Sequence, residues 1–414
     1  MAEITKANGI GDWFDQRLAT KKLAKVMMTE YWIPKNINFL WAMGVVLVVL
    51  FKILIVTGIF LLMYYKPDVN SAFDSVNYTI MQEVEYGWLW RHMHGVAASM
   101  VFLVIYIHMF AGIYYGSYKK GREMIWLTGM AIFGLFSAEA FSGYMLPWGQ
   151  MSYWAAQVIT NLFGGIPLIG DGLVIWIRGD YTVADATLTR FFMLHVFLLP
   201  LAIILLIAVH FYSLRVPHVN NQDGEDLDFD KESKKYLDGK KKESKVVPFW
   251  PIFLAKDFFV VGIAMIVFFY LTFYHFNFAM DPINFEPANA MKTPAHIYPE
   301  WYFLWSYEVL RGFFFDIAGI SAMDIGLAAF GFANVAFMLI PFLDRDPSVK
   351  PAHKRPYFKI WFWILLIDMV VLTVYGKLPP LGINTYIGFV AALTFLVLFA
   401  ALPFITKKDA GGAK

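Results

Sequence analysis

Long apolar segments alternate with short charged segments along the whole chain. A helix rises about 1.5 Å per residue, so about 20 apolar residues cross roughly 30 Å of hydrocarbon. The seventh apolar run is short and carries Asp368. The pattern therefore predicts an all-α, polytopic membrane protein with eight transmembrane helices, at residues 39–63, 93–115, 124–146, 191–214, 252–279, 322–343, 360–376 and 383–405.

Three segments outside these spans have patterns of their own. Residues 12–32 indicate an amphipathic helix at the membrane interface. Residues 148–176 mix Gly, Pro, Trp and Ile without a span-length run, which indicates short helices at the outer membrane surface. Residues 223–245 hold seven Lys and eight acidic residues, which indicates a solvated loop rather than a binding patch.

Lysine and arginine are distributed unequally between the two sides that the spans define. The chain has 34 lysines and arginines in total. On the side with both termini there are 26 of them, on the opposite side seven, and Lys52 lies within the first span. The positive-inside rule therefore puts both termini in the cytoplasm. Charged residues spread from Glu3 to Lys35, so we expect no signal peptide.

Composition supports the membrane assignment and narrows the chemistry. Hydrophobic residues make up 59% of the 414 positions and charged residues 16%, against roughly 45–50% and 25% in soluble domains. A net charge of +2 gives no indication of nucleic-acid binding. Cysteine is absent, which excludes disulfides, Fe–S ligation and c-type haem attachment in this chain. A redox metal would need histidine, carboxylate or methionine ligands.

Four histidines form two pairs with nearly equal spacing: His94 and His108 in the second predicted span, His195 and His210 in the fourth. A step of 14 residues ends about 40° short of four full helical turns, and a step of 15 residues ends about 60° beyond them. The two histidines of each helix therefore share one face and lie about 21 Å apart along the axis. Both spans run inward, which pairs His94 with His195 on the outer side and His108 with His210 on the inner side. Each pair of trans imidazoles is suited to hold one flat iron porphyrin.

Other uses of intramembrane histidine have to be weighed against ligation. A single histidine in a membrane helix more often packs in the core or takes part in a proton relay. Four at paired spacings favour ligation, because a polar group in hydrocarbon is costly unless a partner holds it. A transporter or proton channel without haem is the alternative class.

Glycines repeat the histidine interval on the neighbouring spans. Gly44 and Gly58 lie 14 residues apart in the first span, as do Gly129 and Gly143 in the third. A porphyrin can lie against a backbone without side chains, although glycine pairs in membrane helices also permit close helix packing. The match with the histidine interval favours haem contact.

Five charged residues in or near the spans remain. Arg91 and Arg190 lie at outer helix ends, where they either balance haem propionates or anchor the interface. Lys52, Glu139 and Asp368 lie within spans, where a charge has to be paired, neutral or wetted. Structural pairing is the expectation for these three, with Glu139 the best candidate for a proton route.

Four further segments carry a family signature: WRHMHG at 90–95, GYMLPWGQMSYW at 143–154, TLTRFFMLH at 187–195 and PEWYFLWSYEVLRG at 299–312. With them, almost the whole chain resembles cytochrome b of the quinol:cytochrome c oxidoreductases, in the respiratory rather than the split photosynthetic form. The resemblance implies a Q cycle in a bacterial inner membrane, with two non-covalent b-type haems and quinol and quinone as substrates. It also implies a Rieske Fe–S protein, a c-type cytochrome subunit and a homodimeric complex in the lipid bilayer.

The resemblance also implies an outer site where quinol is oxidised. Such a site needs an apolar cleft for the ring and a base that takes a proton. Glu300 of the PEWY segment is the candidate base. The other residues expected at this site are Tyr302, Tyr144, Phe141, Pro299 and Tyr307.

Quinone reduction near the cytoplasm is implied for a second site. Asp257, preceded by Lys256, stands at the family's carboxylate position, although a Lys-Asp pair at a helix start is otherwise usually a cap. Five residues beyond the inner ligand of the fourth span, respiratory relatives commonly have histidine, and this chain has Arg215. His218 either substitutes for that histidine or faces solvent.

We therefore expect three parts: a dihaem four-helix bundle at 1–220, a charged cytoplasmic loop at 221–247, and a four-helix region with the PEWY segment at 248–414. A dihaem membrane anchor of a quinone-linked dehydrogenase is the alternative within the redox proteins. It has no outer quinol site. The PEWY segment and the long 280–321 connection argue against it and against the transporter.

Overall fold

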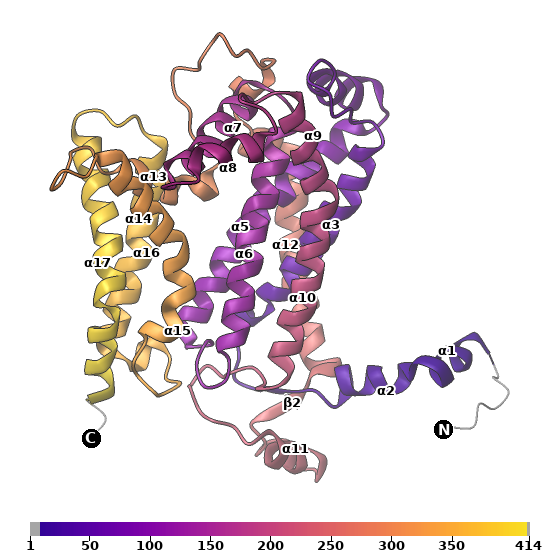
Figure 1. Cartoon of the computed structure of the whole chain (residues 1–414). Coiled ribbons are helices and arrows are strands. Elements are labelled where there is room, and N and C mark those ends of the chain that lie inside the picture. The colour runs from indigo at the N-terminus through magenta and orange to yellow at the C-terminus, as the bar shows by residue number, and fades with distance from the viewer. Residues whose placement is uncertain (1–8, 412–414) are drawn as a thin grey trace.

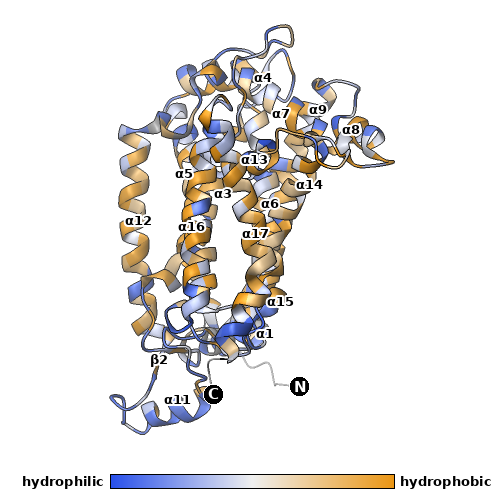
Figure 2. Cartoon of the chain, turned by 90° about the vertical axis from the view of Figure 1, so that its left-hand side faces the viewer, coloured by the Kyte–Doolittle hydropathy of each residue, from blue (hydrophilic) through white to orange (hydrophobic). Residues whose placement is uncertain are grey.

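The computed structural model describes residues 9–411 and shows eight long apolar helical segments packed side by side (Figure 1). Figure 2 shows hydrophobic residues along these segments and hydrophilic residues beyond their ends. The predicted eight-span, all-α class is confirmed. The eight segments are Phe39–Leu62, Gly87–Tyr115, Glu123–Met145, Asp185–Arg215, Phe249–Tyr274, Ala322–Leu343, Pro356–Lys377 and Ile383–Gly411.

Four of the eight spans consist of one regular helix, and the other four contain 3-10 or π turns. The fourth is interrupted at η5 (Leu194–Leu198), a π turn that precedes Pro200 in the first turn of the next helix. Proline lacks the N–H that a regular helix would need there. The helices of the spans are α3 (Met43–Leu62), α5 (Gly87–Tyr115), α6 (Glu123–Met145), α9 (Asp185–Met193), α10 (Leu199–Arg215), α12 (Leu254–Tyr274), α14 (Ala322–Ala336), α15 (Ile340–Leu343), α16 (Pro356–Lys377) and α17 (Ile383–Gly411).

Short elements cover the two ends of the bundle. Helices α1 and α2 extend sideways at the end where the described chain starts and finishes, and α7 and α8 lie across the opposite end (Figure 1). Both arrangements agree with the surface helices expected at 12–32 and 148–176. Outside the spans, the short elements are α1 (Ile10–Leu18), α2 (Thr20–Ala24), η1 (Lys25–Thr29), β1 (Trp32–Pro34), α4 (Ala72–Asp74), η3 (Ser75–Glu83), α7 (Gln150–Leu162), η4 (Phe163–Gly165), α8 (Gly170–Arg178), α11 (Phe229–Leu237), β2 (Val246–Pro248), η7 (Phe276–Ala279), η8 (Pro282–Phe285), η9 (Trp301–Phe303), α13 (Leu304–Arg311) and η11 (Ala352–Lys354). Within the spans lie η2 (Phe39–Ala42), η6 (Phe249–Phe253) and η10 (Phe337–Leu339).

The charged segment 221–247 contains helix α11, which its charge density did not reveal. The Asp228 side chain caps this helix by accepting a hydrogen bond from the Lys231 amide at 3.0 Å. Acidic residues stand in its first turn and lysines in its last, as the helix dipole favours. Strand β2 then pairs antiparallel with β1, with Ile33 opposite Val247. The segment is therefore an ordered hydrophilic cap at this end of the bundle.

A buried ion-pair network joins the two halves of the chain at the same end. Arg355 binds both carboxylate oxygens of Asp344, at 2.6 and 2.9 Å, and Lys119 reaches Asp344 at 2.9 Å. Burial opposes ionisation of this carboxyl, but the Arg355 guanidinium lowers the pKa of Asp344 below its ordinary value. The network fixes the loop between α5 and α6 against the loop between α15 and α16.

Candidate haem and quinol sites

The outer histidine pair faces across the N-terminal bundle. His94 extends from α5 and His195 from the π turn η5, with ring centroids 6.2 Å apart and ring planes at 74°. Imidazole nitrogens bind first-row metals at about 2 Å. With the half-width of each ring added, this separation fits one metal ion held between the two imidazoles. The pairing predicted from spacing is thus present at the outer side.

Each predicted glycine lies against one of the four histidine rings. A Cβ at Gly58 would lie 3.4 Å from Cε1 of His94, and one at Gly143 would overlap the His195 ring. On the inner side, a Cβ at Gly129 would lie 3.2 Å from His210 and one at Gly44 would lie 3.8 Å from His108. The glycines therefore provide space for the imidazole rings themselves, a closer relationship than the porphyrin contact expected from the spacing.

Two threonines orient two of the rings, and sequence reasoning missed both. The Thr57 hydroxyl lies 2.8 Å from Nδ1 of His94, and the Thr128 hydroxyl lies 3.0 Å from Nδ1 of His210. Each hydroxyl also donates to a carbonyl of its own helix at 2.7 Å, so its oxygen is left to accept from Nδ1–H. That tautomer leaves Nε2 unprotonated for a metal. The signal in the sequence is a repeated Thr-Gly dipeptide, at 57–58 and 128–129.

The two arginines near the outer pair have protein partners. Arg91 donates to the Asn77 side chain at 3.0 Å and lies over the Phe285 ring at 5.3 Å. Arg190 donates to the Trp176 carbonyl and packs against Gly179. These contacts agree with anchoring of the outer surface, and propionate binding stays a prediction.

The Glu300 carboxyl lies at the outer end of the bundle and is hydrogen-bonded by the hydroxyl of Tyr144. Burial, together with the negative charge of Asp281, raises the pKa of Glu300 to about 7, against the opposing effects of Tyr144 and Lys377. A carboxyl with this pKa can accept a proton and release it near neutral pH. Its chemistry therefore fits the base predicted from the PEWY segment.

The rest of the PEWY segment is fixed to α5. The Tyr302 ring stacks on Phe102 at 3.9 Å and 5°, and Trp301 donates to the Ser99 hydroxyl at 2.6 Å. The Tyr106 hydroxyl donates to the Tyr302 carbonyl at 2.5 Å. Tyr302 is thus a buried anchor that positions its neighbour Glu300.

The remaining predicted outer residues have contacts of their own at this end of the bundle. Phe141, on α6, packs edge to face on Phe191 at 5.4 Å. Tyr307 donates to the Ile297 carbonyl at 3.1 Å, which closes the loop that holds Pro299. The aromatic residues with a direct effect on the Glu300 carboxyl are Tyr144 and Tyr302, so a quinol-binding role for Phe141, Pro299 and Tyr307 stays a prediction.

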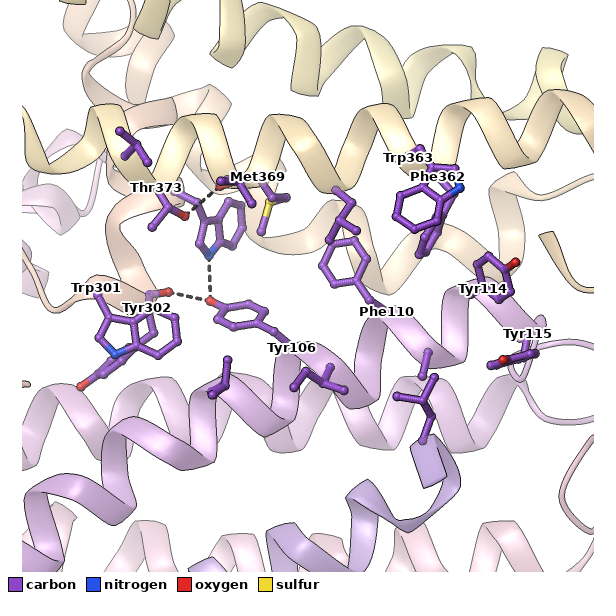
Figure 3. A pocket seen from close by; sticks show the side chains of 18 residues that line it. Tyr106, Phe110, Tyr114, Tyr115, Trp301, Tyr302, Phe362, Trp363, Met369 and Thr373 are labelled. Atoms are coloured by element: carbon purple, nitrogen blue, oxygen red, sulfur yellow. Dashed lines mark hydrogen bonds between the residues drawn. The ribbon is translucent and has the colours of Figure 1, made fainter. Parts of the chain in front are cut away.

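A separate apolar groove lies behind the PEWY segment, between α5 and α16 (Figure 3). Its volume is about 700 Å³ and its walls include Tyr106, Phe110, Trp301 and Trp363. Figure 3 shows the Tyr106 ring below α16, with its hydroxyl joined by hydrogen bonds to the segment. The groove opens on the apolar outer surface of the bundle and does not contain Glu300.

The structure brings together only some of the residues predicted for the inner quinone site. Asp257 is buried at the start of α12, whereas Lys256 is exposed, so the two do not form one site. The Arg215 guanidinium lies 3.7 Å over the Tyr31 ring, and His218 stacks between Tyr31 and Phe229 at 5.5 and 4.2 Å. His218 is therefore packed in an aromatic cluster, and the solvent-facing alternative is wrong.

This inner cluster has polar atoms that lack partners within residues 9–411. Tyr31 Oη, His218 Nδ1 and Asp257 Oδ1 are buried there without a hydrogen bond. Burial raises the pKa of Tyr31 and lowers the pKa of His218, which keeps both side chains neutral. Sequence reasoning missed Tyr31, which stands in the predicted surface segment 12–32.

The three intramembrane charges have different surroundings. Glu139 accompanies the outer histidine pair, with its carboxylate 3.1 Å from His195. Asp368 is buried on α16, and its Oδ2 has no hydrogen bond within residues 9–411. Lys52 is exposed on the outside of α3. The structural pairing expected for Asp368 is thus not found among the described residues.

Comparison with known proteins agrees with these features. Residues 28–217 match the family model described as Cytochrome b/b6/petB, and residues 287–396 match Cytochrome b(C-terminal)/b6/petD. Cytochrome b of Rickettsia typhi is 42% identical over 405 residues, 98% of this chain and 96% of that protein. Cytochrome b of Rhodobacter capsulatus is 40% identical over 407 residues, 95% and 90% of the two chains. A chain of a solved hyperthermophilic respiratory Complex III has a TM-score of 0.87 and 38% identity, covering 97% of this chain and 100% of its own.

The facing outer histidine pair, the eight-helix bundle and the family match define a multi-pass, haem-binding membrane protein of respiratory electron transport. With these matches, the chain belongs to the cytochrome b/b6 family. It is the core subunit of a quinol:cytochrome c oxidoreductase. The resemblance stated from the sequence motifs is confirmed.

Proposed function

We propose that this subunit oxidises quinol near the outer membrane face and reduces quinone near the cytoplasmic face. One electron of each quinol crosses the membrane, and the other leaves to a Rieske Fe–S protein and a c-type cytochrome subunit. The observation that carries this proposal is the half-buried Glu300 carboxyl, hydrogen-bonded by Tyr144 in an outer loop rich in aromatic residues. A dihaem dehydrogenase anchor or a proton channel needs no such quinol-side base.

Two non-covalent b-type haems are part of the proposal. His94 and His195 would hold the outer haem, and His108 and His210 the inner haem. When bound, the haems supply two one-electron carriers that connect the two membrane faces. The threonine contacts support the ligand assignment, because a hydrogen bond at Nδ1 fixes the tautomer that binds metal through Nε2.

Proton removal from quinol is assigned to Glu300. Its neighbour Tyr144 donates to the carboxylate and so holds it in one orientation. The pKa near 7 lets the carboxyl take one proton without a permanent charge at this half-buried position. Release of that proton toward the outer surface passes the region of Asp281 and Lys377, the two charges that act on Glu300.

Quinone reduction is assigned to the inner cluster. The unpartnered Asp257, Tyr31 and His218 atoms support this assignment, because quinone carbonyls and quinol hydroxyls need hydrogen-bond partners. Arg215, stacked on Tyr31, adds positive charge beside them. We assign Lys256 no contact with quinone, since its side chain is exposed whereas that of Asp257 is buried.

The proposal also includes orientation and assembly. Both termini lie in the cytoplasm of a bacterium, and the complex is a homodimer in the inner membrane. The excess of Lys and Arg at the end that holds both described termini supports this orientation.

A reduced-minus-oxidised optical spectrum of the purified complex tests the proposal. We expect two b-type components with different midpoint potentials, and quinol:cytochrome c activity that requires both. Absence of haem would support the channel, and two haems without quinol oxidation would support the dehydrogenase anchor.

A further inference from the structure

Helix α11 of the hydrophilic cap reaches the inner cluster through one aromatic side chain. The Phe229 ring, at the start of α11, stacks on the His218 ring with centroids 4.2 Å apart and planes at 13°. The Tyr31 ring also stacks on this imidazole, at 5.5 Å and 15°. The faces of the His218 ring are thus covered by two aromatic rings, and its in-plane nitrogen atoms remain for contact with a ligand.

The backbone of His218 is held in an uncommon conformation. Its φ angle is +56°, in the left-handed region that residues with a side chain seldom adopt. Such a conformation costs energy and persists where the surrounding structure fixes it. Arg122 does so by donating to the His218 carbonyl at 2.9 Å and to the Pro217 carbonyl at 3.2 Å. The turn after α10 therefore holds this one imidazole in a defined direction.

Helix α11 is fixed to the same two-stranded sheet that follows Tyr31. The Glu232 carboxylate of α11 accepts from the Lys245 amide at 2.7 Å, directly before β2. Strand β2 pairs with β1, which begins one residue after Tyr31. Tyr236 of α11 also packs edge to face on Trp32 of β1 at 5.4 Å. One sheet therefore connects the two elements whose rings enclose His218.

A row of aromatic rings leads from His218 to Asp257. The Phe249 amide donates to the Tyr31 carbonyl at 2.8 Å, and the two rings meet edge to face at 6.2 Å. The Phe253 ring lies 6.2 Å from that of Phe249, and Asp257 follows Phe253 by four residues. Within residues 9–411, Nδ1 of His218 and Oδ1 of Asp257 are buried without a hydrogen bond. The row thus has a polar atom in need of a partner at each end.

We propose that α11 forms one wall of the inner quinone site, and that Phe229 positions His218 so that an imidazole nitrogen donates to a quinone carbonyl. This inference rests on the proposed function, because it needs quinone at the inner cluster. A flat ring with a carbonyl at each end suits aromatic walls with polar atoms at their two ends. Phe229 acts through His218, so it is a positioning residue.

Oxidation of the pre-reduced inner haem by a short-chain benzoquinone tests the inference in the purified complex, using the Phe229→Ala variant. We expect the quinone concentration at half the maximal rate to rise about tenfold with the maximal rate unchanged, because a misplaced imidazole weakens quinone binding without altering the haem. Haem content and quinol-driven reduction of the outer haem should stay as in the wild type. Leu237→Ala is the matched control, since it changes an exposed apolar side chain at the other end of α11.

Two further variants keep the test decisive if Phe229→Ala does not assemble. Phe229→Tyr keeps the stacked ring and should keep the wild-type half-saturating concentration, whereas Phe229→Leu keeps apolar volume without a ring and should raise it. A wild-type concentration in Phe229→Leu or Phe229→Ala, or an equal rise in Leu237→Ala, overturns the inference alone. A wild-type inner haem that quinone does not oxidise overturns the proposed inner site and the inference together.

Discussion

The Tyr106 hydroxyl donates to the backbone carbonyl of Tyr302 at 2.5 Å and accepts from the Trp305 indole N–H at 2.8 Å. One side chain of α5 thereby fixes two points of the outer loop that carries Glu300. The ligand-bearing helix and the quinol-side loop are thus joined by a hydrogen bond across 196 residues of sequence.

Replacing Tyr106 with Phe should loosen that loop. The variant loses both bonds and leaves a buried indole N–H unpaired, at a cost of about 1–3 kcal/mol. Hydrogen–deuterium exchange should show faster exchange at residues 301–308, while haem content stays normal. Tyr386→Phe, which changes an exposed tyrosine, is the control. Unchanged exchange at 301–308 would show that the ring stacking alone holds the segment.

Glycine at position 129 should be required for the inner haem. In Gly129→Val the new side chain meets the His210 ring, which lies 3.2 Å from the first added carbon. We expect loss of the inner-haem absorbance with the outer haem retained. Gly134→Val is the matched control, since a Cβ there has nothing within 4 Å. Equal haem loss in both variants would assign the effect to helix packing.

Haem retention should follow the histidine pairs. His210→Ala should remove the inner haem and leave the outer haem, because the two ligand sets share no residue. His94→Ala should do the reverse. Optical spectra of the two purified variants distinguish the sites, and equal loss of both components from a folded variant would contradict the pairing.

The Asp344 network should contribute strongly to stability. Arg355→Met leaves a buried carboxylate with one cation, Lys119, and breaking a buried ion pair costs about 3–5 kcal/mol. Thermal inactivation of the purified complex should occur at a lower temperature. Lys354→Met is the control, since Lys354 is exposed and bonds only a carbonyl in the described chain. Equal inactivation temperatures would limit the network to a role in assembly.

The sequence predicted more of the fold than of the sites. All eight spans could be found because hydrocarbon thickness fixes the length of an apolar run. Span two begins at Gly87, before the predicted 93, since its first two turns hold Arg91 and His92, which hydropathy excludes. Helix α11 was missed because its capping and dipole contacts involve residues that composition assigns to solvent.

The histidine pairs could be predicted because, in a regular helix, the number of residues between two positions fixes the directions in which their side chains point. The threonines that orient two of the rings were missed because they come from other helices, and the repeated Thr-Gly dipeptide that marks Thr57 and Thr128 does not by itself indicate which histidine each one contacts. The inner cluster was harder to predict than either the histidine pairs or the threonines. Tyr31 comes from a surface segment and reaches Arg215 only through the fold.

The reaction at the outer face should depend on pH in the direction set by Glu300. Its pKa of about 7 means that the carboxylate is available above pH 7 and protonated below it. Quinol-driven reduction of the outer haem should therefore slow as the pH falls below 7 and level off above it. A rate that rises as the pH falls would contradict a basic role for this carboxyl.

The most direct test of the account is the pre-steady-state rate of quinol-driven reduction of the outer haem in Glu300→Gln. Gln can still hydrogen-bond a quinol hydroxyl but cannot take its proton, so we expect a rate about 10²-fold lower, no pH dependence around 7, and both haems in place. Glu286→Gln, which alters an exposed carboxylate of the same outer loop, should keep the wild-type rate. A wild-type rate and pH profile in Glu300→Gln would contradict the assignment of proton removal to this residue.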